Sequence, residues 1–167
     1  SGSASAVASG QCMGALGSCT GGSIRGPASL CGIVGLKPTY GRVSRFGVVT
    51  LSWSQDHCGP MTWNVEDTAY MLQAIAGHDP KDPTTSRAPV PDYSLSLKED
   101  IRGVKVGLPR HYFFDPDPSV NSEVVSTVEK AVAALQELGV QVEEVTLPSL
   151  EHVRAANSVI MVTEAYA

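Results

Sequence analysis

Residues 12–32 read CMGALGSCTGGSIRGPASLCG, and this stretch sets the expected fold of the N-terminal part of the chain. The apolar run at residues 12–17 predicts a short buried strand. A turn rich in hydroxyl side chains and glycine follows at residues 18–23. Pro27 suits the first turn of a helix, which we expect to run to Gly32. The stretch is therefore predicted to form a strand, a glycine-rich loop and a helix.

Glycine is concentrated around this stretch. Of the 16 glycines in 167 residues, 12 fall within residues 1–60, together with all four cysteines and only five charged side chains. Close backbone packing requires such small residues, so we expect the buried centre of a larger α/β protein. Residues 3–9, all small, predict a short helix that ends at Gly10. The sequence begins without Met and stops inside a helical pattern at residues 157–167, so we expect a fragment.

Downstream of the helix the pattern changes several times. Residues 33–36 and 40–43 predict short strand pieces, and a polar and aromatic loop is expected at residues 53–60. Residues 64–77 predict an amphipathic helix that begins with an asparagine cap and ends at a glycine. Residues 78–96 contain four prolines, which predict an irregular surface segment.

The C-terminal part predicts a β-α-β unit. Apolar residues alternate at positions 104, 106 and 108 as in a strand, and Asp117 and Pro118 are expected to open a helix that includes Val120 and closes at Gly139. Residues 140–142 alternate as a second strand. A helical crossover of this kind requires parallel strands, so the fold class is α/β.

Composition excludes several classes of function. The net charge of −5 argues against a basic nucleic-acid surface. No apolar run is long enough to span a membrane, and the first residues lack the basic region and long apolar run that are typical of a signal peptide. The cysteines and histidines lack zinc-site spacing, and no cofactor motif is found. We expect no metal, no cofactor, no nucleic-acid contact within this chain, no membrane association and a cytoplasmic location.

Three interpretations fit the loop at residues 20–23. Its glycines let backbone N–H groups converge on a developing negative charge, which suits an oxyanion hole. A tight turn with a capping serine explains the same residues. A phosphate cradle is the third interpretation, although no Gly-Lys-[Ser/Thr] follows. The G-x-S-x-G elbow of the α/β-hydrolases is absent.

A serine nucleophile in this loop needs a base, and the sequence offers few. No histidine or acidic residue occurs in the first 36 residues. This points to a lysine-based or serine-relayed system, in which a hydroxyl passes the proton to a neutral lysine. Lys37 is the only lysine in the first 80 residues, but its position before Pro38 favours a structural salt bridge.

The long run at residues 17–47, GSCTGGSIRGPASLCGIVGLKPTYGRVSRFG, strongly resembles the amidase signature family. The resemblance continues through residues 54–61, 65–67 and 74–80, and more loosely through 103–109 and 135–148. It implies a mixed β-sheet surrounded by helices, truncated at both ends in this chain. We therefore expect residues 1–167 to be the central segment of one such domain.

The resemblance also implies a Ser-cisSer-Lys triad, of which this chain holds one member. Ser23 matches the nucleophile, and the backbone N–H groups of Thr20, Gly21, Gly22 and Ser23 match the oxyanion hole. In the same register the cis-serine falls just before Ser1, and the catalytic lysine lies further upstream. Lys37 matches a different segment of the family pattern.

Three residues are expected to support the site. The family usually has Asp where this chain has Cys19, and that Asp is expected to pair with the equivalent of Arg25. The substitution leaves Arg25 to find another partner or stay solvated, and Cys19 is expected to be a small packing residue. Asp56, with His57, fits the family's long loop near the site, where hydrogen bonds that hold the loop are the favoured role.

The expected function is an amidase that cleaves linear carboxylic amides through an acyl-serine intermediate. Residues 52–61 look more like the general amidases than like the A subunit of the glutamyl-tRNA amidotransferases, which is the alternative. A non-catalytic fragment or degenerate paralogue, and an anion-binding loop, also stay open. We expect a small-molecule amide as substrate, an oligomer or a missing remainder of the enzyme as partner, exposed apolar surface, and no turnover by the isolated chain.

Three segments are expected within the chain. Residues 1–77 form the Gly/Ser-rich core that carries the catalytic loop, and residues 78–98 form the proline-rich surface loop. Residues 99–167 hold the β-α-β unit and the start of a helix.

Overall fold

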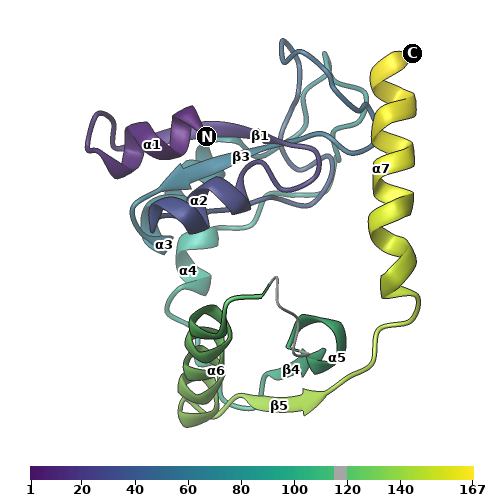
Figure 1. The fold of residues 1–167 in the computed structure, drawn as a ribbon. Helices are drawn as coiled ribbons and strands as arrows, with labels where there is room; N and C mark the ends of the chain where they lie inside the picture. The colour runs from purple at the N-terminus through teal and green to yellow at the C-terminus, as the bar shows by residue number, and fades with distance from the viewer. Residues whose placement is uncertain (115–119) are drawn as a thin grey trace. The chain divides into compact units, whose positions relative to one another are not determined.

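The computed structural model of the chain describes residues 1–114 and 120–167. It divides into two units, one made of residues 1–98 with 156–167, and the other of residues 99–155. Both contain helices and strands (Figure 1), so the expected α/β class is confirmed.

The first unit is built on a three-stranded antiparallel sheet. Its strands are β1 (Gly14–Cys19), β2 (Val34–Gly35) and β3 (His57–Thr62), and β3 lies between the other two. The expected first strand is therefore present, shifted by two residues toward the loop. It is only partly buried, with Leu16 and Ser18 exposed, rather than fully buried as predicted.

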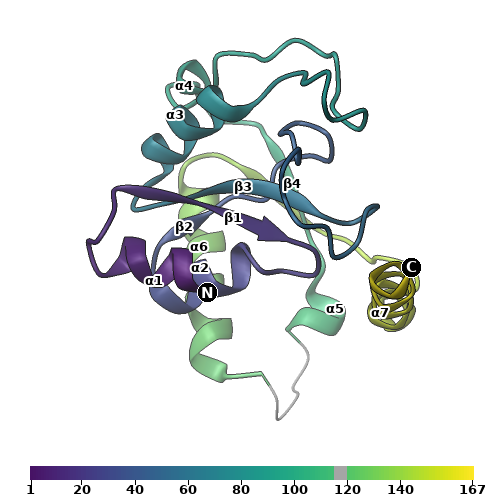
Figure 2. The ribbon, with the colours of Figure 1, turned by 90° about the horizontal axis from the view of Figure 1, so that it is seen from above.

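Helices cover both faces of this sheet. On one face α1 (Gly2–Ala8) and α2 (Arg25–Cys31) pack over Met61, which is 1% exposed. On the other face α3 (Val65–Ile75) packs over Cys58. Met61 and Cys58 have opposite parity along β3 and so point to opposite faces of the sheet. The result is a helix, sheet, helix arrangement (Figure 2).

The helix ends follow the sequence signals. The Asn64 side chain accepts a hydrogen bond from the Asp67 N–H at 2.8 Å and caps α3 as predicted. Gly32 follows α2 with φ of 67°, in the left-handed conformation that favours glycine. Thr68, Ala69 and Leu72 are the buried residues of α3, so the helix is amphipathic as predicted, and Val65 at its start is exposed.

The central strand β3 corrects the expectation of a loop over residues 53–60. A proline inside a central strand normally argues against a strand, because it cannot donate to the ladder. Here the Leu36 N–H donates to the Pro60 carbonyl at 3.0 Å, so the ring nitrogen of Pro60 faces the same side. The pairing of β2 with β3 includes only Val34 and Gly35, so it stops before it reaches Pro60. Because the ring nitrogen of Pro60 faces the β2 side, β3 loses no hydrogen bond to β1.

The segment between α2 and β3 is otherwise irregular. Residues 40–43 do not form the expected strand, and only Val43 forms an isolated bridge, with Ala76. The proline-rich segment contains one short helix, α4 (Tyr93–Ser96), which the prolines had argued against. Asp92 allows it by accepting from the Ser94 N–H at 2.9 Å as a cap.

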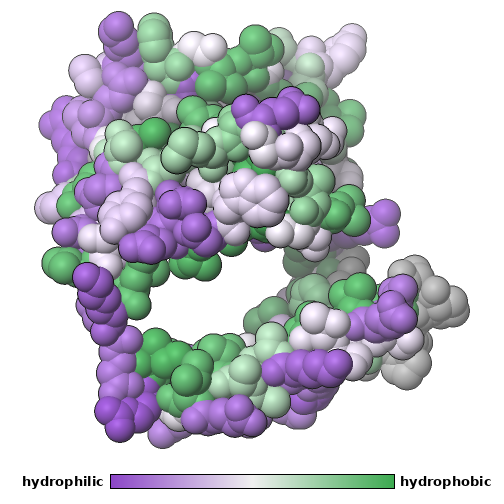
Figure 3. All heavy atoms as spheres, turned by 90° about the vertical axis from the view of Figure 1, so that its left-hand side faces the viewer, coloured by the Kyte–Doolittle hydropathy of each residue, from purple (hydrophilic) through white to green (hydrophobic). Residues whose placement is uncertain are grey.

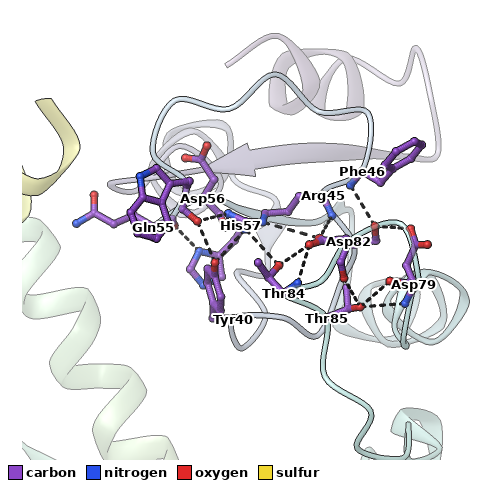
Figure 4. A network of polar contacts seen from close by, with 12 residues as sticks. Tyr40, Arg45, Phe46, Gln55, Asp56, His57, Asp79, Asp82, Thr84 and Thr85 are labelled. Carbon is purple, nitrogen blue, oxygen red and sulfur yellow. Dashed lines mark hydrogen bonds and ion pairs between the residues drawn. The ribbon is translucent and has the colours of Figure 1, made fainter. Parts of the chain in front are cut away.

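Arg45 links the proline-rich segment at residues 78–96 to the loop before β3. Its guanidinium donates to the Trp53 carbonyl at 2.7 Å and to Thr84 Oγ1 at 3.2 Å. Asp82, only 6% exposed, accepts from the Arg45 N–H at 2.8 Å and from the Thr84 hydroxyl at 2.6 Å. The network in Figure 4 therefore joins the proline-rich segment to the residues before β3.

The second unit contains β4 (Lys105–Leu108), α5 (Arg110–Phe113), α6 (Ser122–Glu137) and β5 (Gln141–Glu144). The strands are parallel, as predicted. Asn121 caps α6, so the helix begins after Val120 rather than before it. Asp117 and Pro118 lie outside the described residues. Apolar side chains reach the surface in both units (Figure 3).

The last helix, α7 (Leu150–Tyr166), includes the predicted helical residues and begins earlier. Its residues from Ala156 onward belong to the first unit. Among the described residues, no helix combines the length and apolar character needed to cross a bilayer, and no group of three metal-ligating side chains occurs.

Candidate active site

The loop between β1 and α2 contains the predicted nucleophile. Strand β1 ends at the buried Cys19 and α2 begins at Arg25, so the loop is short. The backbone of Gly22 has a φ of 141°, which residues other than glycine rarely adopt. Gly21 and Ser23 are exposed. The backbone therefore presents the Ser23 side chain at the surface, at the start of a helix.

Three successive backbone donors of this loop are available to a ligand. Within the described residues, the N–H groups of Gly21, Gly22 and Ser23 donate to no acceptor. The Ser23 hydroxyl has no partner there either. Glycine at two of the three positions leaves access to these donors open. Such a set of donors beside a hydroxyl is what an oxyanion hole requires.

Asp56 connects the loop to the segment before β3. Its side chain is 7% exposed, and Oδ1 accepts a hydrogen bond from the Thr20 hydroxyl at 2.5 Å. Oδ2 accepts from the N–H groups of Leu51 and Ser52 at 2.8 and 3.0 Å. Asp56 thus forms the loop-holding hydrogen bonds that were predicted, and it fixes the residue that directly precedes Gly21.

His57 is fully engaged beside this carboxylate. Its Nδ1 lies 2.6 Å from the Gln55 carbonyl and its Nε2 lies 3.1 Å from Lys37 Nζ. A proton on Nδ1 satisfies both contacts, because Nε2 then accepts from the ammonium. Burial and the positive charges of Lys37 and Arg45 lower the pKa of His57 from its ordinary value, against the raising effect of its backbone hydrogen bonds. The ring is therefore neutral in the folded protein near pH 7.

Lys37 differs from its prediction. The expected salt bridge is not found among residues 1–114 and 120–167. Instead, Lys37 Nζ donates to His57 Nε2 and, at 3.2 Å, to the Pro38 carbonyl. The acceptors are neutral because the strand β3 places a histidine, not a carboxylate, opposite this lysine.

The lowered pKa of His57 makes stability depend on pH. Between the folded and unfolded pKa values the unfolded chain binds the proton, so stability is complete above about pH 6.5 and falls as the pH is lowered below it. Urea midpoints measured from pH 7.5 to 5.5 should decline, and His57→Gln should flatten the decline. Carboxylates with lowered pKa, such as Asp82, titrate below this range. An unchanged slope in His57→Gln would contradict this assignment.

Cys19 and Arg25 lie at the two ends of the loop. Cys19 is 1% exposed and packs with Ile24 and Met61 in the core between the sheet and the first two helices. Arg25 is exposed and forms no ion pair within the part of the chain that the structure describes. The neutral thiol thus occupies a packing position, and the arginine remains solvated there.

Helix α7 brings in residues that were not predicted from the sequence. Glu164 accepts hydrogen bonds from Ser54 at 2.6 Å and from Ser52. Asn157 Nδ2 lies 3.7 Å from the position that a Cβ on Gly21 would occupy. The one available signal was that Glu164 is the only charged residue in residues 155–167. Its partners lie more than 100 residues away in sequence, as the separation of 112 from Ser52 shows.

Comparison with known proteins identifies the family. The family model described as Amidase matches residues 1–167, the whole chain. The chain belongs to the amidase signature family. The resemblance noted for residues 17–47 is therefore confirmed.

The proteins similar to this amidase-family chain include two kinds that bear on its function. The first is the A subunit of glutamyl-tRNA(Gln) amidotransferase. The one from Syntrophobacter fumaroxidans is 51% identical over 164 residues, covering 98% of this chain and 33% of the relative. The crystal structure of the one from Thermotoga maritima has a TM-score of 0.93 and 42% identity, covering 99% of this chain and 36% of the other.

The second kind is represented by the native peptide amidase from Stenotrophomonas maltophilia. Its structure has a TM-score of 0.85 and 38% identity, covering 98% of this chain and 34% of the other. The chain thus spans about a third of the length of the relatives it matches. Both branches suggested by the sequence are represented among them.

Proposed function

We propose that this chain carries the nucleophile and oxyanion loop of an enzyme that cleaves carboxylic amides through an acyl-serine intermediate. The observation that supports it is the exposed Ser23 beside the unoccupied N–H groups of Gly21, Gly22 and Ser23. Membership of the amidase signature family supports the choice of an amide as substrate. A phosphate cradle and a plain turn then become the less favoured interpretations.

The proposed first step forms a bond between Ser23 Oγ and the substrate carbonyl carbon. The carbonyl oxygen becomes negatively charged and accepts hydrogen bonds from the loop N–H groups, including that of Thr20. Collapse of this intermediate breaks the C–N bond, and the nitrogen leaves with a proton as ammonia or an amine. The acyl group remains on Ser23 until water or another acceptor takes it.

The proton that leaves Ser23 needs a base, and the described residues near the loop do not provide one. His57 uses both ring nitrogens on Gln55 and Lys37, and Lys37 in turn donates to His57. We therefore propose that the cis-serine and lysine of the family triad act from sequence outside these 167 residues. The chain by itself is then inactive.

A second candidate is a glutamine amidotransferase of the A-subunit type. The 51% identity to such a protein favours it, and residues 52–61 favour the amidase branch. The chemistry at Ser23 is shared, but ammonia from glutamine would pass to an acceptor held with a partner protein. Ammonia release from glutamine and from simple linear amides, compared in the complete protein, separates the two. Preference for glutamine supports the second candidate.

Asp56 is proposed to keep the oxyanion loop in its active geometry. Asp56→Ala leaves the Thr20 hydroxyl without its acceptor, so we expect kcat to fall roughly 10- to 100-fold with little change in KM. Steady-state kinetics on the complete protein measure this.

Asp82→Ala is the matched control for Asp56→Ala. Asp82 is equally buried and also accepts from a threonine hydroxyl and backbone N–H groups, but none of them lies in the loop. Both variants should lose stability. Only Asp56→Ala should show a fall in kcat that is larger than its fraction of unfolded enzyme explains. Equal kcat values for the two folded variants would refute the role.

A further inference from the structure

One face of α7 lies against the segments that form the candidate site. Asn157, Met161 and Glu164 are half-buried, while residues 158–160 and 162–163 between them are exposed. Spacings of four and three residues place all three side chains on one side of a helix. This side of α7 therefore contacts the rest of the first unit.

Glu164 is bound by three donors from one short segment. Its Oε1 accepts from the Ser54 hydroxyl at 2.6 Å. Its Oε2 accepts from the Ser54 N–H at 3.0 Å and from the hydroxyl of Ser52, which is fully buried. Burial raises the pKa of Glu164, but these hydrogen bonds outweigh it and leave the pKa below its ordinary value. The group is an ionised carboxylate at neutral pH.

The segment that Glu164 binds leads directly to the oxyanion loop. The Ser52 N–H donates to Asp56 Oδ2, and Asp56 Oδ1 accepts from Thr20. A continuous series of hydrogen bonds thus runs from α7 to the residue before Gly21. Glu164 and Ser52 form its first link, and Asp56 and Thr20 form its last.

The same face of α7 also approaches the loop itself. Asn157, two helical turns before Glu164, has its Nδ2 3.7 Å from the position that a Cβ on Gly21 would occupy. The helix therefore lies close to the loop at one end and is hydrogen-bonded to it through Ser52 and Asp56 at the other.

From these contacts we infer that Glu164 is a positioning residue for the reaction at Ser23: it fixes the segment at residues 52–54, and through Asp56 it fixes Thr20 and the oxyanion loop. It does not touch the substrate. The inference rests on the proposed function, and it adds a residue that neither the loop motif nor its near neighbours contain.

A glutamine can replace this carboxylate, but an alanine cannot. In Glu164→Gln the side-chain oxygen can accept from Ser52 and the Ser54 N–H, and the new NH₂ can donate to the Ser54 hydroxyl. Glu164→Ala removes every acceptor and leaves the buried Ser52 hydroxyl unpaired. The two variants therefore separate loss of the contacts from loss of the charge.

The experiment compares kcat, KM and thermal unfolding in the complete protein for Glu164→Ala, Glu164→Gln and a control, Asp92→Ala. Asp92 likewise accepts from the N–H and hydroxyl of one serine, at the start of α4. We expect Glu164→Ala to lower kcat about 10- to 100-fold with KM within about 3-fold, and Glu164→Gln to restore most of kcat. Asp92→Ala should lose some stability and keep kcat.

Three outcomes overturn the inference: full kcat in folded Glu164→Ala, a loss in Glu164→Gln as large as that in Glu164→Ala, or an equal loss in Asp92→Ala. If Glu164→Ala does not fold, Ser54→Ala removes one hydroxyl donor and should lower kcat by a smaller factor. Turnover that survives Ser23→Ala refutes the proposed function instead. Loss in Ser23→Ala with full activity in Glu164→Ala refutes only the positioning role.

Discussion

Ser23→Ala should reduce kcat/KM for amide cleavage at least about 10³-fold while leaving the thermal midpoint unchanged. The reason for the large loss is that no other described hydroxyl combines exposure with the free N–H groups of Gly21, Gly22 and Ser23. The reason for unchanged stability is that the Ser23 side chain is exposed and has no partner in the described residues. Ammonia release by the complete protein measures the first, and thermal unfolding the second.

Ser29→Ala is the control for this substitution. Ser29 is an exposed serine on α2, the helix that follows Ser23. Each variant therefore removes one exposed serine hydroxyl, and the two positions are close in the chain. Ser29→Ala should retain full turnover. Trapping with hydroxylamine should yield a hydroxamate in the parent protein and in Ser29→Ala, because both form the acyl-serine. Residual turnover above about one per cent in Ser23→Ala would exclude Ser23 as nucleophile.

Gly59→Ala should destabilise the protein by about 3 kcal/mol or more, which is the largest stability effect we expect. A Cβ on Gly59 would lie 2.1 Å from the Leu36 carbonyl oxygen and 2.7 Å from Pro38 Cδ. The oxygen belongs to the backbone and cannot move without displacing the chain beside β2. Because β3 is the central strand, the displacement also affects its pairing with β1. Urea unfolding measures the loss.

Gly26→Ala is the matched control. Gly26 lies within α2, and a Cβ there would meet nothing within 4 Å outside its chain neighbours and the helix backbone. Alanine favours a helix over glycine by about 0.5–1 kcal/mol, and the restriction that Pro27 places on the residue before it offsets part of this gain, so this variant should stay within about 1 kcal/mol of the parent. If Gly59→Ala is as stable as Gly26→Ala, the close approach of Leu36 to β3 does not exist in solution.

Local signals predicted several elements well. The Asn64 cap, the glycine after α2 and the alternation of residues 104–108 each depend on neighbours in sequence, and each appears in the structure. The strand β3 was missed for the same reason. Pro60 and Gly59 look like loop residues locally, and only the short β2 ladder and the close passage of Leu36 make a strand acceptable there.

The supporting residues of the site show the same division. Asp56 was identified from its sequence context, but its partner Thr20 could not be, because the two lie 36 residues apart and meet only when β1 pairs with β3. Lys37 was expected to meet a carboxylate and instead meets His57, since β3 places that ring opposite it. Charge alone does not predict which acceptor a lysine finds.

By itself, the sequence determined the α/β class, the family resemblance and the loop with its candidate nucleophile Ser23, because these reside in contiguous residues whose local chemistry is visible one after another. Only the tertiary structure decided that β3 is central, that Asp56 binds Thr20, and that Glu164 reaches Ser52 across 112 residues. The physical reason is that a buried donor or acceptor takes whichever partner packing brings near, and packing joins residues that sequence order separates.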